Sequence, residues 1–216
     1  MVSGFGNVNL SSTAPTHEGK PMVHDPYELP EDLPVPVDDG SCSHLQGTRM
    51  PGVLLPSTHN RLINVADVSE MAVFFFYPRT GRPGELPPKG WDSIPGARGC
   101  TPESCSYRDR YRLFKAIGYE VFGVSSQTPE DQREFALRSG IPFEILSDSE
   151  LALTDSLKLP TFNVKEIATP LIKRLTIVTQ ARVIAKVFYP VFPPDENAEE
   201  VLGYLQERSP NKMTER

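Results

Sequence analysis

The pattern of apolar and polar positions changes near residue 48. Residues 1–47 are rich in Pro, Ser, Asp and Gly and show little apolar periodicity, which predicts an extension that is disordered or wraps around the surface. Residues 48–208 carry apolar runs with strand and helix periods, which predicts one folded domain of ordinary size. Residues 209–216 are polar and are expected to form a C-terminal tail.

Two continuous apolar runs, Met71–Pro78 and Tyr119–Ser126, predict strands that are buried on both faces. Two helices are predicted at 101–117 and Pro129–Ser139, because each region opens with Thr-Pro and ends before a glycine. Shorter elements are expected as well: two strands around a turn at 57–60, a strand at 143–146, a helix at 149–159, a hairpin that turns at Gln180–Ala181, and a last amphipathic helix at 195–208.

Between the first long strand and the first long helix lies a loop, residues 79–99, whose glycines and prolines exclude regular structure. Strands that alternate with helices, followed by a hairpin and a last helix, indicate an α/β fold with a central mixed sheet and helices on both faces. Two cysteines stand where the first helix begins, and this order of elements is the thioredoxin-like arrangement.

The net charge of −6, from 22 Lys and Arg against 28 Asp and Glu, argues against a nucleic-acid partner. The basic residues are scattered and the longest apolar run is far too short to cross a bilayer, so no membrane partner is expected. The N-terminal residues lack the order of a secretory signal. Three cysteines do not make a secreted disulfide framework, so we expect a reducing compartment, the cytoplasm.

Cys100 and Cys105 are separated by four residues, a spacing unlike that of a C-x-x-C redox motif. On an intact helix their Cα atoms would lie about 8.7 Å apart. A disulfide needs Cα atoms within roughly 7 Å, so the bond requires the first turn of the helix to unfold. That turn is the least costly part of a helix to unfold, because it has few hydrogen bonds of its own.

Position gives the two thiols different roles. The helix N-terminus and the neighbouring Arg98 are expected to lower the pKa of the Cys100 thiol, whereas Cys105 lies one turn further along. Cys100 is therefore the predicted attacking thiol and Cys105 the resolving thiol. A thiolate that attacks a peroxide becomes a sulfenic acid, which condenses with a second thiol to a disulfide. An external dithiol must then reduce that disulfide.

Other interpretations of the cysteines remain open at this stage. They could be inert and buried, since free cysteine is among the most buried residues. They could form a redox switch without enzymatic activity, or a site for disulfide exchange. A zinc site is disfavoured because the paired ligand spacing is absent. Cys42 lies in the extension and is expected to take no part.

Three segments together resemble a known family. "FFFYP", "GCTPESCSYRD" and "KRLTIV" are similar to the peroxiredoxins, specifically the Q type, also called bacterioferritin comigratory protein. The likeness runs from about His44 to Leu205. It implies a thioredoxin fold and thiol-dependent reduction of peroxides without metal, haem or another cofactor. The peroxidatic cysteine falls on Cys100, the resolving cysteine on Cys105 and the active-site arginine on Arg174.

The sequence departs from the family motif, Pro-x3-Thr-x2-Cys, in two ways. Pro78 matches the proline by context, but the loop 79–99, which contains Trp91, is inserted before Cys100. Ala97 stands where the family has Thr or Ser, so the hydroxyl that would bind the sulfur is missing. We expect Thr101, Ser93 or backbone N–H groups of the loop to replace it, with Arg98 and Pro78 supporting the substrate site.

The resemblance also implies the partners: a peroxide as substrate and thioredoxin or a similar dithiol as reductant. For the chain itself we expect a monomer or a weak dimer.

Overall fold

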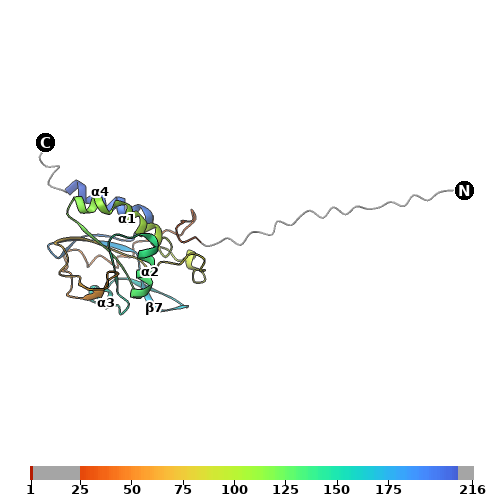
Figure 1. Ribbon diagram of the computed structural model, residues 1–216, viewed down its shortest axis with the longest axis horizontal. Coiled ribbons are helices and arrows are strands. Elements are labelled where there is room, and N and C mark those ends of the chain that lie inside the picture. Colours follow the sequence, from red (N-terminus) through yellow and green to blue (C-terminus); the bar gives the residue numbers. More distant parts are fainter. Residues whose placement is uncertain (2–24, 209–216) are drawn as a thin grey trace.

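The computed structural model describes Met1 and residues 25–208, and its centre is a five-stranded mixed sheet with the strand order β5-β4-β3-β8-β9 (Figure 1). Strands β3, β4 and β5 are parallel, whereas β8 and β9 run antiparallel to their neighbours. The five strands are β3 (Met71–Phe76), β4 (Glu120–Ser125), β5 (Glu144–Ser147), β8 (Leu175–Gln180) and β9 (Val183–Phe188). The predicted α/β fold with a central mixed sheet is confirmed.

Strand β3 lies in the middle of the sheet and supplies both halves of the core. Side chains alternate across a strand, so Val73 and Phe75 enter one apolar cluster while Phe74 and Phe76 enter the other. All four are fully buried. Strand β3 is therefore fixed from both faces, and the chain that leaves its C-terminal end starts from a rigid point.

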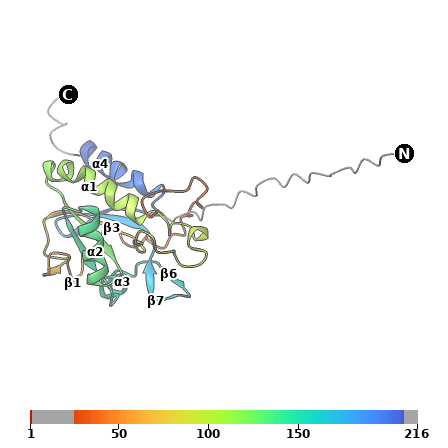
Figure 2. The same cartoon turned by 45° about the vertical axis from the view of Figure 1, so that its right-hand side comes forward.

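Helices cover both faces of the sheet, as expected. Helices α1 (Cys100–Ala116), α2 (Pro129–Ser139) and α4 (Asn197–Arg208) pack on the face that Phe75 enters, and α3 (Ala152–Leu157) packs on the opposite face. The connections β3-α1-β4 and β4-α2-β5 step in the same direction along the sheet, and right-handed crossovers place both helices on one face. Helices α1 and α4 lie side by side in both views (Figure 2).

The predicted boundaries are close to the observed ones for most elements. The hairpin of β1 (Leu54–Pro56) and β2 (Leu62–Asn64) forms around the expected turn, and Thr128 and Gly140 cap α2. The sequence missed a second hairpin, β6 (Thr161–Val164) and β7 (Ile167–Ile172). It also placed the β8–β9 turn one residue early: Ala181 and Arg182 carry the positive φ angles.

The loop 79–99, which we call the site loop, packs on the missed hairpin. Trp91 begins a short 3₁₀ helix, η1 (Trp91–Ser93), and its ring lies 6.3 Å from that of Phe162 on β6. Trp91, Ala97, Val164 and Leu171 form a small buried cluster between the loop and the hairpin. A loop without strands is thus held in place by apolar contacts.

The N-terminal segment from residue 25 lies against the folded body. Asp39 accepts hydrogen bonds from Lys173 and Tyr189, and these lower the pKa of its carboxyl group. Residues 2–24 of the expected extension and the expected tail, 209–216, lie outside the described residues. None of the described helices is long and apolar enough to span a membrane.

Helix α1 begins at Cys100 with Gly99 as its N-cap, whereas the Thr-Pro pattern predicted a start at Thr101 with its side chain as the cap. Gly99 has φ 103°, a conformation that residues with a Cβ rarely adopt. Leu29 and Pro194, the first residue of the 3₁₀ helix η2 (Pro194–Glu196), lie directly against it. No side chain caps this helix because neighbouring segments occupy the space that a capping side chain would need.

We predict that Gly99→Ala destabilises the fold more than Gly140→Ala does. Both glycines have positive φ, which costs an alanine about 1–2 kcal/mol. At Gly99 the added Cβ would also collide with Pro194 and lie 2.9 Å from Leu29, whereas at Gly140 it meets nothing within 4 Å. Overpacking adds roughly 1–3 kcal/mol at Gly99 alone. Urea unfolding of both variants measures the difference, and equal losses would contradict the packing described here.

Candidate functional site

Cys100 lies beyond the C-terminal end of the central strand β3, where ligand sites of α/β sheets are usually found. Its sulfur contacts three groups. Arg174 Nη2 lies 3.2 Å from Sγ, the backbone N–H of Arg79 donates a hydrogen bond to it, and the thiol donates to Ala97 O at 3.5 Å. The sulfur thus lies between a guanidinium group and two ends of the site loop.

Strand pairing brings Arg174 to the sulfur. Leu175 of β8 pairs with Phe76, the last residue of β3, so Arg174 lies just beyond the C-terminal end of β3. The guanidinium is buried and forms an ion pair with Glu103, and Nη2 donates to the carbonyls of Ala97 (3.3 Å) and Arg98 (3.0 Å). These bonds fix its orientation toward Cys100.

The predicted low pKa of the Cys100 thiol is wrong for this arrangement. Burial raises its pKa above the usual value and the nearby Glu103 carboxylate raises it further, whereas Arg174 and the Arg79 N–H act in the opposite direction. Only 3% of Cys100 is exposed, because the site loop and the N-terminal segment cover the helix start. The desolvation of a buried thiolate and the charge of Glu103 together outweigh the guanidinium group and the Arg79 N–H.

Glu103 is a site residue for which the sequence predicts no role. It is fully buried, and burial raises its pKa to about 7 against the lowering effect of Arg174. Its position three residues after Cys100 places both side chains on one face of α1. The spacing alone indicates that Glu103 and Cys100 lie close together. Only the position of Arg174 shows that the carboxyl group and the thiol share one cation.

Cys105 lies on the same helix, half-buried and unbonded. Burial also raises the pKa of its thiol, and the positive charge of Arg108 opposes this effect. Both thiols lie on an intact α1, so the spacing of about 8.7 Å between their Cα atoms applies. Cys42 is buried in the apolar cluster on the opposite face of the sheet, and burial raises its pKa to about 12.

A cavity of about 360 Å³ opens above Cys100. Thr101 and Arg98 line it, together with Arg79 and other residues of the site loop. Pro78 is buried and places the Arg79 N–H at the sulfur; Pro78 itself does not line the cavity. Among the described residues, no group of three or more His, Cys, Asp or Glu side chains is arranged to bind a metal.

The missing hydroxyl has a partial replacement. The Arg79 N–H donates to the Cys100 sulfur, as expected of a loop N–H group. Thr80, the threonine that follows Pro78 most closely, bonds to Gln127 instead, and Ser93 is exposed on η1. Arg79 was not singled out in the sequence, because nothing in its local pattern distinguishes it from the other basic residues of the loop.

The segment Asp25–Leu29, which we call the strap, lies over the start of α1. Arg98 Nη2 donates to the carbonyls of Asp25 (2.8 Å) and Glu28 (3.1 Å), so the residue two before Cys100 is bonded to the strap. Tyr27 OH is 3.1 Å from Ser139 Oγ and accepts a hydrogen bond from Arg138. Arg138 is one of the charges that act on Cys105, so the strap passes near both thiols.

Comparisons with known proteins find relatives of this chain. The family model described as "AhpC/TSA family" matches residues 93–187, a range that begins after most of the site loop. Peroxiredoxin Q of Sedum lineare is 27% identical over 74% of this chain and 77% of its own length. Peroxiredoxin bcp1 of Schizosaccharomyces pombe is 31% identical over 56% of this chain and 58% of its own length. Peroxiredoxin Q of Populus jackii is 29% identical, and the chain spans only 54% of its length.

Solved structures show the same fold. Peroxiredoxin Q of Xanthomonas campestris superposes with a TM-score of 0.57 over 82% of this chain and 99% of its own, at 19% identity. Peroxidoxin BcpB of Mycobacterium tuberculosis superposes with a TM-score of 0.59 over 76% of this chain and 98% of its own, at 22% identity. The predicted thioredoxin-like fold is thereby confirmed. Over residues 93–187 the chain is similar to the AhpC/TSA family, and the Sedum lineare and Populus jackii relatives are named peroxiredoxin Q.

Proposed function

We propose that this protein is a thiol-dependent peroxidase that reduces hydrogen peroxide or organic hydroperoxides. One observation carries the proposal: the Cys100 sulfur lines a cavity and lies 3.2 Å from a buried, ion-paired guanidinium. Such a group stabilises both the thiolate and the negative charge that develops on the peroxide oxygens. The Q-type relatives support the same reading.

In the proposed reaction the Cys100 thiolate attacks the terminal oxygen of the hydroperoxide. An S–O bond forms, the O–O bond breaks, and its electron pair leaves with the second oxygen, which takes up a proton to give water or an alcohol. Because burial raises the pKa of Cys100, the thiol must first lose its proton inside the site. Glu103, with a pKa of about 7, takes up a proton in the same pH range and frees Arg174 to stabilise the thiolate.

The second half of the proposed cycle uses Cys105. The Cys105 thiol attacks the Cys100 sulfenic acid, a disulfide forms and water leaves. The first turn of α1 must unfold, because the Cα atoms have to approach within roughly 7 Å. Thioredoxin or a similar dithiol then reduces the disulfide.

The proposal assigns the chemistry to residues 48–208, in a monomer or weak dimer. We propose a reducing compartment, the cytoplasm, because three cysteines do not make a secreted disulfide framework.

A redox switch without rapid turnover is the alternative that one observation favours. Arg98 directly precedes the N-cap of α1 and is hydrogen-bonded to the strap. A disulfide that unfolds the first turn of α1 would therefore also displace the strap. Rate separates the two functions. A switch would consume peroxide no faster than a free thiol at the same pH.

We predict that Cys100→Ser lowers peroxide consumption at least about 100-fold in a thioredoxin-coupled NADPH assay, because the attacking sulfur is lost. Cys105→Ser should still form one equivalent of sulfenic acid but should not be recycled by thioredoxin. Cys42→Ser is the matched control and should retain full turnover. Activity that survives Cys100→Ser would exclude the mechanism.

We predict that Glu103→Gln lowers the pKa of the Cys100 thiol. Glutamine still accepts a hydrogen bond from Arg174 but removes the negative charge that raises the thiol pKa. Glu103 is largely ionised only above pH 7, so the variant should be alkylated several-fold faster at pH 8 and differ little below pH 6. The pH dependence of Cys100 alkylation, read by mass spectrometry, measures the shift. Glu130→Gln, at an exposed position on α2, is the control; no shift in Glu103→Gln would refute the shared-cation model.

We predict that a weaker strap speeds disulfide formation. Leu29→Ala removes the contact with Gly99, and Tyr27→Phe removes the hydrogen bonds to Ser139 and Arg138. After rapid mixing with excess peroxide and acid quenching, the double variant should contain more Cys100–Cys105 disulfide and less Cys100 sulfinic acid than the parent. Val37→Ala, an exposed position beyond the strap, should behave like the parent. Equal disulfide rates in all three proteins would show that the strap does not limit the unfolding of α1.

A further inference from the structure

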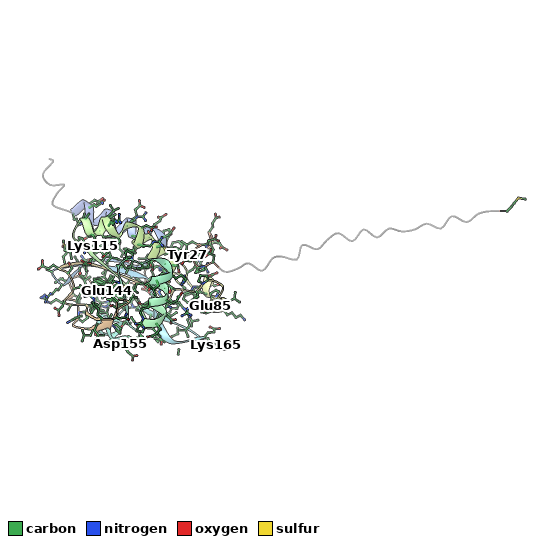
Figure 3. The ribbon with its side chains drawn as sticks, in the orientation of Figure 1. Tyr27, Glu85, Lys115, Glu144, Asp155 and Lys165 are labelled. Carbon is green, nitrogen blue, oxygen red and sulfur yellow. The ribbon has the colours of Figure 1, made fainter. Side chains whose placement is uncertain are left out.

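Tyr27 is the tyrosine of this chain that a modifying enzyme can reach. All seven tyrosines of the sequence lie among the described residues, and Tyr27 alone is exposed, at 40%. It belongs to the strap, whose residues form turns but no helix or strand (Figure 3 labels Tyr27). An irregular surface segment can leave its place and enter the active site of another enzyme at little cost. The Tyr27 hydroxyl therefore meets the first requirement of a modification site.

Two arginines and a serine surround this hydroxyl. Arg138 Nη1 donates a hydrogen bond to Tyr27 Oη over 3.0 Å, and its guanidinium carbon lies 5.9 Å from the centre of the tyrosine ring. Ser139 Oγ lies 3.1 Å from the same oxygen. Arg108 reaches this place from α1: its Nη1 donates to the carbonyl of Ser139 at 2.7 Å, and its charge interacts with Tyr27. Helices α1 and α2 thus each present one cation near a single hydroxyl.

Carboxylates near the two arginines do not cancel their attraction for an anion. Arg138 is paired with Glu134 and Arg108 with Asp109, and each acid is more exposed than the arginine that it contacts. Solvent screens such exposed carboxylates strongly. A phosphate group on a tyrosine carries about −1.5 to −2 charges at pH 7 and three acceptor oxygens, more than a single carboxylate offers. Arginines bind such groups through charge-assisted hydrogen bonds.

The sequence around Tyr27 is acidic, which defines the enzyme that would bind it. No Lys or Arg occurs between Lys20 and Arg49. Four acids lie on or just after the strap, and all four are exposed: Asp25, Glu28, Glu31 and Asp32. By charge complementarity, an enzyme that binds this segment has a basic substrate groove. On the folded protein the exposed acids repel a phosphate only weakly, because solvent screens them.

We propose that Tyr27 is a phosphorylation site and that Arg108 and Arg138 bind the phosphate on the folded protein. A tyrosine kinase transfers the γ-phosphoryl group of ATP to the phenol. A bond forms between Tyr27 Oη and the γ-phosphorus, and the bond from that phosphorus to its bridging oxygen breaks. The electron pair of the broken bond leaves with ADP, and the phenol proton is released.

A phosphate at Tyr27 would slow the resolution step for two reasons, and this consequence rests on the proposed peroxidase cycle. The charges of Arg108 and Arg138 lower the pKa of the Cys105 thiol, so a dianion that neutralises them raises this pKa and leaves less thiolate. The new hydrogen bonds also join the strap more firmly to α1 and α2, so the first turn of α1 unfolds less readily. The sulfenic acid of Cys100 therefore lasts longer.

The first test measures access to Tyr27. A tyrosine kinase that phosphorylates acidic substrates is mixed with ATP, the full-length protein and a free peptide of residues 25–33. Mass spectrometry should find phosphate on Tyr27 of the protein and on no other tyrosine. Tyr27→Phe is the matched control and should take up no phosphate. If the peptide is phosphorylated and the protein is not, Tyr27 is not a site on the folded chain and the proposal is overturned.

The second test measures binding of the phosphate, in the full chain made with phosphotyrosine at position 27. Phosphorus NMR follows the second ionisation of the phosphate, whose pKa is ordinarily about 6. Nearby cations favour the dianion, so we expect this pKa to fall by roughly one unit. Arg108→Gln and Arg138→Gln should each restore part of the ordinary value, and the double variant all of it. Arg182→Gln, beyond the far end of β8, is the control and should change nothing.

The third test measures the consequence for Cys105. At pH 8 the phosphorylated protein should be alkylated at Cys105 several-fold more slowly than the unmodified protein. After rapid mixing with one equivalent of hydrogen peroxide and acid quenching, it should contain less Cys100–Cys105 disulfide and more Cys100 sulfenic acid. The double variant Arg108→Gln with Arg138→Gln should respond much less to the phosphate in both measurements, because its charges are already absent.

Failure of the inference and failure of the proposed function give different results. An ordinary phosphate pKa, or a lowered one that survives the double variant, would show that these arginines do not bind the phosphate, whatever the peroxidase activity. If the phosphate is bound but disulfide forms equally fast, the control of resolution is overturned. If neither form consumes peroxide faster than a free thiol, the proposed function fails, and the NMR and kinase results alone decide on the phosphate site.

Discussion

The site depends on one buried cation that two acidic groups share. Arg174 is in contact with Glu103 and Cys100, and all three residues are buried. One guanidinium group neutralises one anion, and a second unpaired anion in such a place is costly. Either Glu103 or Cys100 therefore carries a proton. Burial is the main cause that raises the pKa of each group above its usual value, and the Glu103 carboxylate raises the pKa of Cys100 further. A buried thiolate can form here when Glu103 accepts a proton.

The contact between Arg174 and Cys100 depends on the backbone at the start of α1. The position of Arg174 follows from β8, and that of the sulfur follows from the first residue of α1, so the contact persists only while that first turn is folded. Leu29 and Pro194 both lie against Gly99, and Arg98 is bonded to the strap. The folded helix start is thus stabilised by segments from opposite ends of the chain. In the proposed cycle the same turn must unfold for Cys105 to reach Cys100. The proposed attack on the peroxide therefore needs a folded first turn, whereas the proposed disulfide formation needs an unfolded one.

Local patterns predicted the parts of the fold that local physics determines. Met71–Phe76 is apolar at every position because β3 is buried on both faces, and Thr128-Pro129 and Gly140 mark the ends of α2 as capping residues do. The β6–β7 hairpin was missed because Lys165 and Glu166 at its turn and Pro170 in β7 interrupt the alternation of a strand. Its stability comes from contacts with the site loop, which the spacing of its own residues does not reveal.

At the site, too, local spacing predicted some features, whereas others depend on tertiary contacts. Cys100 and Cys105 could be assigned to one helix from their spacing. The pKa of Cys100 could not be predicted, because its burial arises from the fold of the site loop and from the strap, which is distant in the sequence. The roles of Glu103 and Arg79 depend equally on tertiary contacts. Arg174 was found only through the family motif, since an arginine before a strand is ordinarily a surface residue.

The site loop shows how an insertion can leave the reacting centre intact. Its first residue, Arg79, donates its N–H to the sulfur, and Ala97 near its end accepts from both the sulfur and Arg174. Both ends of the loop are thus fixed at the same point, and closing a longer loop between fixed ends costs little additional entropy. Ala97 is fully buried in the cluster around Trp91, where its small side chain packs against the apolar contacts of the loop. The middle of the loop is then free to vary, and it is this part that forms the cavity wall. The contacts of the loop with the sulfur and most of its contribution to the cavity wall therefore come from different residues of one segment.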